Sequence, residues 1–141
     1  MSLFKIFDTA GSALAAQSVR MNVTASNMAN ADTISSSVNE TYRARYPVFE
    51  AVLRENMAFG EGDDVAGVRV LGIVEGTTPP RAEYRPDHPQ ADEAGYIFRP
   101  DINMVEQMTD MISASRNFQS NIEVINASKQ MMLRTLQLGQ G

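Results

Sequence analysis

The residues most capable of chemistry in this chain surround its single histidine, His88. Asp87, Asp92 and Glu93 lie close to it in the sequence, so that an imidazole and several carboxylates could bind a divalent cation. Such sites need several converging ligands, and the chain offers no second histidine and no cysteine. A Ser–His–acid triad would also depend on His88, which lies in a Pro-rich segment without a nucleophile-elbow motif. We therefore expect His88 to stabilise a turn, and we expect neither a metal site nor enzyme activity.

Two further patterns could bind a cofactor. Met104, Met108 and Met111 recur at helical spacing and could bind copper through their thioethers. Methionine is also adaptable apolar filler, and the same row continues in Phe, Ile and Leu, which favours packing. The glycines near Gly60 surround Glu61, Asp63 and Asp64, whose charge would repel a phosphate. We therefore expect no cofactor.

The overall charge narrows the classes of partner. The formal net charge is -5 and the pI is about 4.8, which argues against nucleic acid and anionic membranes as partners. The first residues lack the apolar stretch of a cleaved signal, and no run of 18 apolar residues could span a bilayer. We expect a mature, soluble protein without membrane insertion.

The C-terminal segment predicts one long helix. Apolar residues alternate there at steps of four and three, the pattern of a coiled-coil seam. Eight of the ten positions in the row are apolar: Met104, Met108, Met111, Ser115, Phe118, Ile122, Ile125, Lys129, Met132 and Leu136, of which Ser115 and Lys129 are the exceptions. A helix over residues 104–138 would span about 52 Å, more than the about 30 Å of a small domain, so part of its seam needs foreign partners.

The N-terminal segment predicts a second helix, over about residues 3–30. Its seam positions are Phe7, Ala10, Leu14, Gln17, Met21, Thr24 and Met28. From Thr9 to Ala31 the only charged residue is Arg20, which is typical of a helix that other helices surround. Asn27 and Asn30 could cap the end of this helix or form hydrogen bonds across a helix interface, and the sequence allows both.

The region between the helices predicts a polar linker followed by a small β-rich insert. We expect an extended arm, with a short helix at its end, over residues 42–53, and an acidic turn at residues 60–64. The clearest strand signal is Val68–Val74, and a short strand is expected at Tyr96–Phe98. Asn103, with Glu106 three residues later, resembles a capping box. The predicted fold class is α+β, divided into an N-terminal helix (1–30), a linker and arm (31–64), a β-rich insert (65–100) and a C-terminal helix (101–141).

The whole chain resembles the proximal rod proteins of the bacterial flagellum, within the superfamily of axial rod and hook proteins. The segment Ala25-Ser-Asn-Met-Ala-Asn-Ala-Asp-Thr33 matches the N-terminal signature of that superfamily. Residues 108–119 and the ending Leu136-Gln-Leu-Gly139 are more specific to the proximal rod. Arg85 and Asp87 replace an expected acid and glycine, which affects only the turn geometry expected there.

The resemblance implies a structural subunit of the proximal rod that transmits torque. The terminal helices would pair in a coiled-coil-like axial layer that orders on assembly. The implied partners are copies of the chain, other rod proteins, the membrane-ring adaptor and the flagellar type III export apparatus. The subunit would reach the periplasmic basal body without a cleaved signal. The alternatives are another rod-family axial protein or a soluble coiled-coil adaptor.

The predicted self-assembly interface combines seam positions of both helices with the two asparagines. It comprises Phe7, Leu14, Met21, Asn27, Met28, Asn30, Met104, Met108, Met111, Phe118, Ile122, Ile125, Met132 and Leu136.

Overall fold

The computed structural model describes residues 3–54 and 64–139. The order of elements is α1 (Leu3–Asn30), β1 (Arg45–Arg54), β2 (Asp64–Glu75), β3 (Arg81–Tyr84), β4 (Tyr96–Arg99) and α2 (Met104–Gly139). The α+β prediction is therefore confirmed, and both terminal helices have the expected extents. Residues 60–63 of the expected acidic turn lie outside the described residues.

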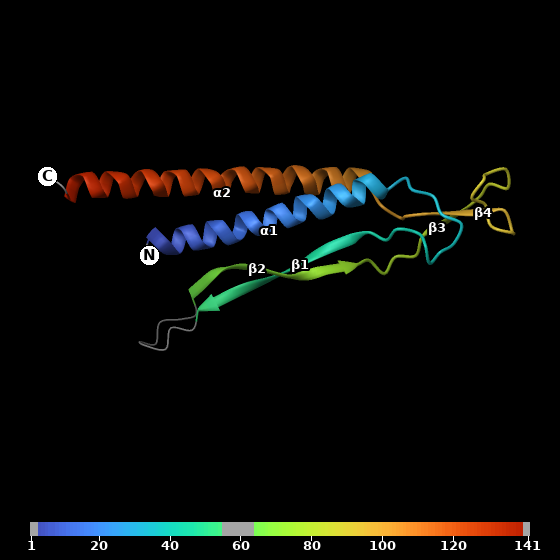
Figure 1. The fold of residues 1–141 in the computed structure, drawn as a ribbon, viewed down its shortest axis with the longest axis horizontal. Coiled ribbons are helices and arrows are strands. Elements are labelled where there is room, and N and C mark those ends of the chain that lie inside the picture. Colours follow the sequence, from blue (N-terminus) through green and yellow to red (C-terminus); the bar gives the residue numbers. More distant parts are fainter. Residues whose placement is uncertain (1–2, 55–63, 140–141) are drawn as a thin grey trace. The chain divides into compact units, whose positions relative to one another are not determined.

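The chain forms two compact units. One comprises Met1–Val19, Val48–Gly72 and Ser113–Gly141, and the other comprises Arg20–Pro47 and Ile73–Ile112. Each unit contains a segment of α1 and a segment of α2, and the two segments run in opposite directions (Figure 1).

Side-chain hydrogen bonds cap the start of α2 and the end of α1. The Asn103 Oδ1 atom accepts hydrogen bonds from the backbone amides of Val105 (3.1 Å) and Glu106 (3.4 Å) and so caps the start of α2. At the end of α1, the Asn30 Nδ2 atom donates to the Ser26 carbonyl at 2.8 Å. The Asn30 carbonyl then accepts from the hydroxyl of Thr33 at 2.7 Å, which closes the turn after the helix.

The buried face of α2 follows the predicted heptad spacing with one correction. Apart from Asp110 and Ser115, which are also half-buried, the positions that are buried or half-buried alternate at steps of three and four: Met104, Gln107, Met111, Ala114, Phe118, Asn121, Ile125, Ser128 and Met132. The sequence predicted one of the two rows in this seam correctly. The other row lies one position earlier than expected, because small and hydrogen-bonding residues such as Ala114 (0% exposed) and Ser128 (2%) allow close packing.

The larger residues of the expected second row lie on the surface of the chain. Met108, Ile122 and Leu136 are 49%, 39% and 63% exposed. A seven-residue repeat allows either neighbouring row to complete a seam, so apolar character alone does not tell which row packs within the chain.

The arm expected after the linker is a strand. β1 pairs with β2 in a two-stranded sheet, and the arrows of the two strands point in opposite directions (Figure 1). The short helix expected at the end of the arm is therefore wrong for the residues up to Arg54. Pro47 lies within β1, and a two-stranded sheet tolerates it because each strand has an unpaired edge. Exposed cross-strand ion pairs connect Glu50 with Arg69 at 2.6 Å and Arg45 with Glu75 at 3.3 Å.

β3 and β4 form a second antiparallel pair, with Arg81 opposite Arg99 and Tyr84 opposite Tyr96. Ile97 of β4 is fully buried, and the rings of Tyr84 and Tyr96 meet edge to face at a centroid distance of 5.2 Å. In the connection between these strands, Gly95 has a φ of +82°, a conformation that favours glycine. The predicted strand signals at Val68–Val74 and Tyr96–Phe98 are thus confirmed.

A close contact joins β2 to the first half of α1. The Ser12 Oγ atom donates to the Thr9 carbonyl at 2.8 Å and accepts from the Val68 amide at 3.1 Å. A Cβ atom placed on Gly67 would lie 2.5 Å from this oxygen and 3.2 Å from the Ser12 Cβ atom. Glycine at position 67 therefore lets the strand approach the helix closely enough for the Val68 amide to reach the Ser12 hydroxyl.

We predict that Gly67→Ala lowers the free energy of unfolding by about 1–3 kcal/mol, because the added methyl group forces Ser12 out of both hydrogen bonds. Urea unfolding followed by circular dichroism measures this change. Gly72→Ala is the matched control, since Gly72 lies in the same strand and a Cβ atom there has nothing within 4 Å. Equal stabilities of the two variants would contradict the importance of this contact.

Candidate functional site

His88 has a structural role in the turn between β3 and β4. Its Nδ1 atom accepts a hydrogen bond from the Gln90 amide at 3.1 Å, and its own amide donates to the Arg85 carbonyl at 3.1 Å. The nearby Asp92 Oδ1 atom accepts from the amides of Ala94 (2.9 Å) and Tyr96 (2.7 Å). The role predicted for His88, in a turn, is confirmed. Among the described residues, no group of three or more His, Cys, Asp or Glu side chains is arranged to hold a metal ion.

The most densely bonded polar side chain of the described helices is Asn27, in the last turn of α1. Asn27 is 1% exposed, and four hydrogen bonds satisfy its amide. The Nδ2 atom donates to the Arg45 carbonyl (2.8 Å) and to the Gln107 Oε1 atom (3.0 Å). The Oδ1 atom accepts from the Arg45 amide (2.9 Å) and from the Tyr42 hydroxyl (2.9 Å).

These bonds connect three elements that are far apart in the sequence. The paired bonds to the backbone of Arg45 imitate the pairing of two strands and hold the first residue of β1 against α1. The bond to Gln107, a residue that is 4% exposed, connects Asn27 to the second turn of α2. The sequence left open whether Asn27 and Asn30 are caps or cross-element contacts. Asn27 forms cross-element contacts and Asn30 is a cap.

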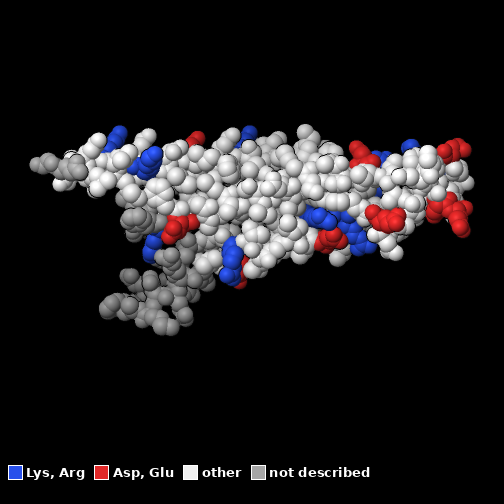
Figure 2. Space-filling view, in the orientation of Figure 1, with Lys and Arg blue, Asp and Glu red and all other residues white. Residues whose placement is uncertain are grey.

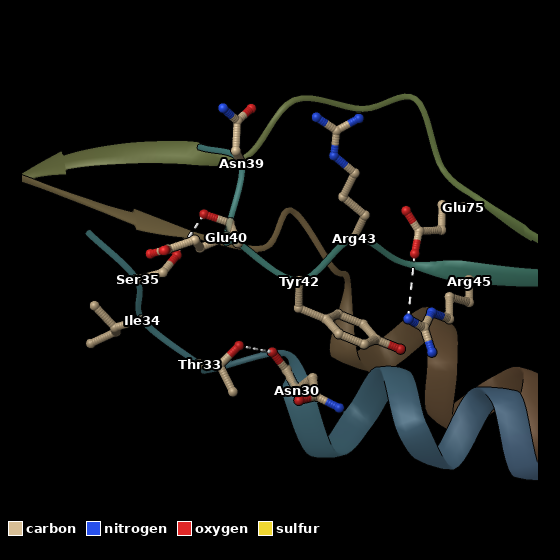
Figure 3. A pocket seen from close by; sticks show the side chains of 11 residues that line it. Asn30, Thr33, Ile34, Ser35, Asn39, Glu40, Tyr42, Arg43, Arg45 and Glu75 are labelled. Atoms are coloured by element: carbon tan, nitrogen blue, oxygen red, sulfur yellow. Dashed lines mark hydrogen bonds and ion pairs between the residues drawn. The ribbon is translucent and has the colours of Figure 1, made fainter. Parts of the chain in front are cut away.

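A polar pocket of about 440 Å³ lies beside this cluster. It is lined by the end of α1, the following loop, the start of β1 and the end of β2, from Asn30 to Glu75 (Figure 3). The Arg45 guanidinium lies 5.5 Å from the centroid of the Tyr42 ring and forms an ion pair with Glu75. Tyr42 Oη and Ser26 Oγ share a hydrogen bond of 3.1 Å. These side chains bind one another and hold the loop in place, an arrangement that suits a structural role.

A second polar region joins the loop after α1 to the β3–β4 pair. Ser35 and Phe98 form an antiparallel bridge, with both N–O distances 3.0 Å. Arg99 forms ion pairs with Asp32 (2.5 Å) and Glu83 (3.8 Å). Figure 2, drawn in the orientation of Figure 1, shows acidic side chains around the connection between β3 and β4.

The residues of the predicted assembly interface fall into two groups. Those that are buried or half-buried in the chain are Phe7, Leu14, Met21, Asn27, Met28, Asn30, Met104, Met111, Phe118, Ile125 and Met132. Met108, Ile122 and Leu136 are exposed. Further exposed apolar residues of α2 that the heptad pattern omitted are Val105, Ile112, Val124, Met131, Leu133 and Leu138.

The partners of Asn27 were missed by the sequence interpretation. Gln107 could have been noticed, because it falls at a seam spacing between Met104 and Met111. The bonds from the backbone of Arg45 and from Tyr42 have no sequence signal, since they depend on where β1 lies against α1.

On β2, Leu71, Ile73 and Val74 are also more than half exposed, at 58%, 53% and 51%.

None of the described helices is long and apolar enough to cross a membrane. On the face drawn in Figure 2, much of the surface is free of Lys, Arg, Asp and Glu. Of the 17 large apolar residues exposed in the described parts of the chain, nine lie on α2.

Comparison with known proteins gives a consistent result over the whole chain. Residues 7–34 match the family model "Flagella basal body rod protein", and residues 93–138 match "Flagellar basal body rod FlgEFG protein C-terminal". The flagellar basal-body rod proteins FlgC of Yersinia enterocolitica and Salmonella typhimurium are each 46% identical over 140 residues, which cover 99% of this chain and all of theirs. FlgC of Buchnera aphidicola (subsp. Acyrthosiphon pisum) is 36% identical over 142 residues, with the same coverage.

We predict that Asn27→Asp lowers the free energy of unfolding by about 3–5 kcal/mol, because it buries a charge and removes both amide donors. The Gln107 side chain can rotate its amide to donate instead, but the Arg45 carbonyl then faces a carboxylate. Chemical unfolding of the full chain, followed by circular dichroism, measures the loss. Asn30→Asp is the matched control, because its amide bonds only within its own helix; a similar loss in both variants would contradict the special role of Asn27.

Proposed function

The chain belongs to the FlgC family of flagellar basal-body rod proteins, and from this membership we propose that it builds the proximal part of the rod by self-assembly through α1 and α2. It is a structural subunit of the basal-body rod. In this proposal the assembled helices form a coiled-coil-like layer and pass torque along the rod.

The observation that carries the proposal is the apolar surface of α2. Nine of its large apolar residues are at least 39% exposed: Val105, Met108, Ile112, Ile122, Val124, Met131, Leu133, Leu136 and Leu138. Large apolar side chains that stay exposed on a helix cost free energy in water, and in such number they indicate contact with other proteins. The single chain leaves this surface uncovered, whereas neighbouring subunits would cover it.

The composition of α1 supports the same assembly. The positions of α1 that remain exposed in the chain are mostly small, with Gly11, Ala15, Ala25 and Ala29 among them. Small residues let the backbones of neighbouring helices approach closely, and the near absence of charge avoids a desolvation cost when a neighbour covers them.

Torque transmission needs stiffness and no catalytic group. In our proposal stiffness comes from many buried helix contacts acting together, including the hydrogen bonds of Asn27 that join both helices to β1. Close-packed protein interiors have low compressibility and so transmit strain.

The partners and the location follow from family membership. We propose that copies of this chain contact one another, other rod proteins and the membrane-ring adaptor, after export by the flagellar type III apparatus without a cleaved signal. The rod would then lie in the periplasmic space.

We predict that Ile122→Glu abolishes swimming while the isolated chain loses only about 1 kcal/mol of stability, because Ile122 is 39% exposed in the chain and would be buried fully only on assembly. Swim-zone diameter in a strain that lacks the native gene measures function, and chemical unfolding measures stability. The control Gln119→Glu changes an exposed polar residue of the same helix and should reduce swimming less. Normal swimming with Ile122→Glu would count against assembly through this face.

A further inference from the structure

The methionines of the described residues fall into two groups that differ in exposure. Met108 and Met131, both on α2, are 49% and 50% exposed. The half-buried group comprises Met21, Met28, Met104, Met111 and Met132. The chain has no cysteine, so methionine is its only side chain that contains sulfur. Among the described residues, the thioethers of Met108 and Met131 are therefore the sulfur groups that a dissolved reagent reaches most easily.

Met108 lies in the middle of an apolar stripe near the start of α2. Val105, Met108 and Ile112 follow one another at steps of three and four residues, so they share one side of the helix. Val105 is 71% and Ile112 53% exposed. A chemical change at Met108 therefore alters the centre of an exposed apolar surface.

Met131 has the same position in a second apolar stripe, near the end of α2. Val124, Met131 and Leu138 follow one another at steps of seven residues, which correspond to two helical turns. The exposed Ala127 lies between the first two. Val124 is 41% and Leu138 84% exposed. Each exposed methionine of α2 is thus the sulfur-containing residue of its own stripe.

A peroxide oxidises an exposed thioether without a catalytic group. The sulfur attacks one oxygen of hydrogen peroxide, and the O–O bond breaks. The departing hydroxide takes up the proton of the transferred hydroxyl and is released as water. The sulfur loses two electrons, the peroxide gains them, and the product is a methionine sulfoxide.

A sulfoxide changes the two stripes more than it changes the isolated chain. In the isolated chain water continues to solvate the new oxygen, so α2 keeps its structure. In the proposed assembly the stripes are covered, and their other members have no side-chain donor for that oxygen. Burial of a polar group without a hydrogen-bond partner is unfavourable, so oxidation opposes assembly.

We propose that Met108 and Met131 are oxidative modification sites, and that their conversion to sulfoxides by a peroxide stops assembly of the chain. This inference rests on the proposed function and adds a means of regulation to it. A methionine sulfoxide reductase reverses the modification: a dithiol supplies two electrons, the oxygen leaves as water, and the thioether is restored. Neighbouring subunits cover both side chains after assembly, so the modification acts on the free chain.

Site-resolved oxidation tests the chemical part of the proposal. The full-length chain would be treated with hydrogen peroxide for short times, and tandem mass spectrometry would give the sulfoxide fraction at each methionine. Because exposure governs the rate, we expect Met108 and Met131 to oxidise about threefold faster than Met104, Met111 and Met132. Equal rates in the two groups would overturn the assignment.

The onset of swimming tests the effect on assembly. In a strain that lacks the native gene, expression of the chain would be induced with and without sublethal hydrogen peroxide, and the time until cells swim would be measured. The variant with Met108→Leu and Met131→Leu keeps the volume and apolar character of both side chains but cannot be oxidised there. We expect peroxide to delay swimming about twofold more with the unmodified chain than with this variant.

Other effects of peroxide on the cell are common to both strains, so an equal delay in the two would overturn the proposal. Met104→Leu with Met132→Leu is the matched control, because these methionines of the same helix are half-buried. The control should be delayed as much as the unmodified chain. Protection by the control equal to that of the first variant would also overturn the assignment.

Failure of the modification and failure of the proposed function give different results. An unmodified chain that does not restore swimming without peroxide overturns the proposed function. A chain that restores swimming, with the same peroxide delay in all variants, overturns only the modification. Should the double leucine variant fail to swim without peroxide, Met108→Leu and Met131→Leu are compared singly, and absence of protection in both would overturn the proposal.

Discussion

The buried amide of Asn27 holds together three segments of this chain that are far apart in the sequence. Burying an amide is unfavourable unless each of its donors and acceptors finds a partner, and all four of its bonds are made here. These partners come from Tyr42, the first residue of β1 and the second turn of α2, so the amide is satisfied only when all three segments are in place. We therefore expect the end of α1, the start of β1 and the start of α2 to fold cooperatively.

A similar solution appears where α1 meets β2. There a serine hydroxyl replaces the amide, and Gly67 provides the space that the strand needs to reach it. Hydrogen bonds of this kind fix where along the helix a strand is held. Burial of small apolar residues is not directional and does not fix that position. The small residues of α1 make close approach possible, and the polar groups decide where the approach occurs.

The apolar residues of α2 are divided between two tasks. One row packs within the chain, and a second row, together with both ends of the helix, stays exposed. Few large side chains of the described residues are fully buried, Ile97 being one of them. A chain with so little internal core and so much exposed apolar helix is suited to a structure completed by neighbouring subunits, as expected of a basal-body rod protein.

The amino-acid sequence by itself determined the two terminal helices, the Asn103 cap of α2, two of the strands and the rod family, because these depend on local periodicity and on short motifs. It also determined one row of the α2 seam, at Met104, Met111, Phe118, Ile125 and Met132. Only the tertiary structure decided that the second row is Gln107, Ala114, Asn121 and Ser128 and not the larger residues beside them. The reason is that a heptad repeat is equally regular in either row, and the choice depends on space and hydrogen-bond partners from other elements. The strand β1, and the partners that Asn27 finds there, were decided in the same way, by contacts between residues distant in the sequence.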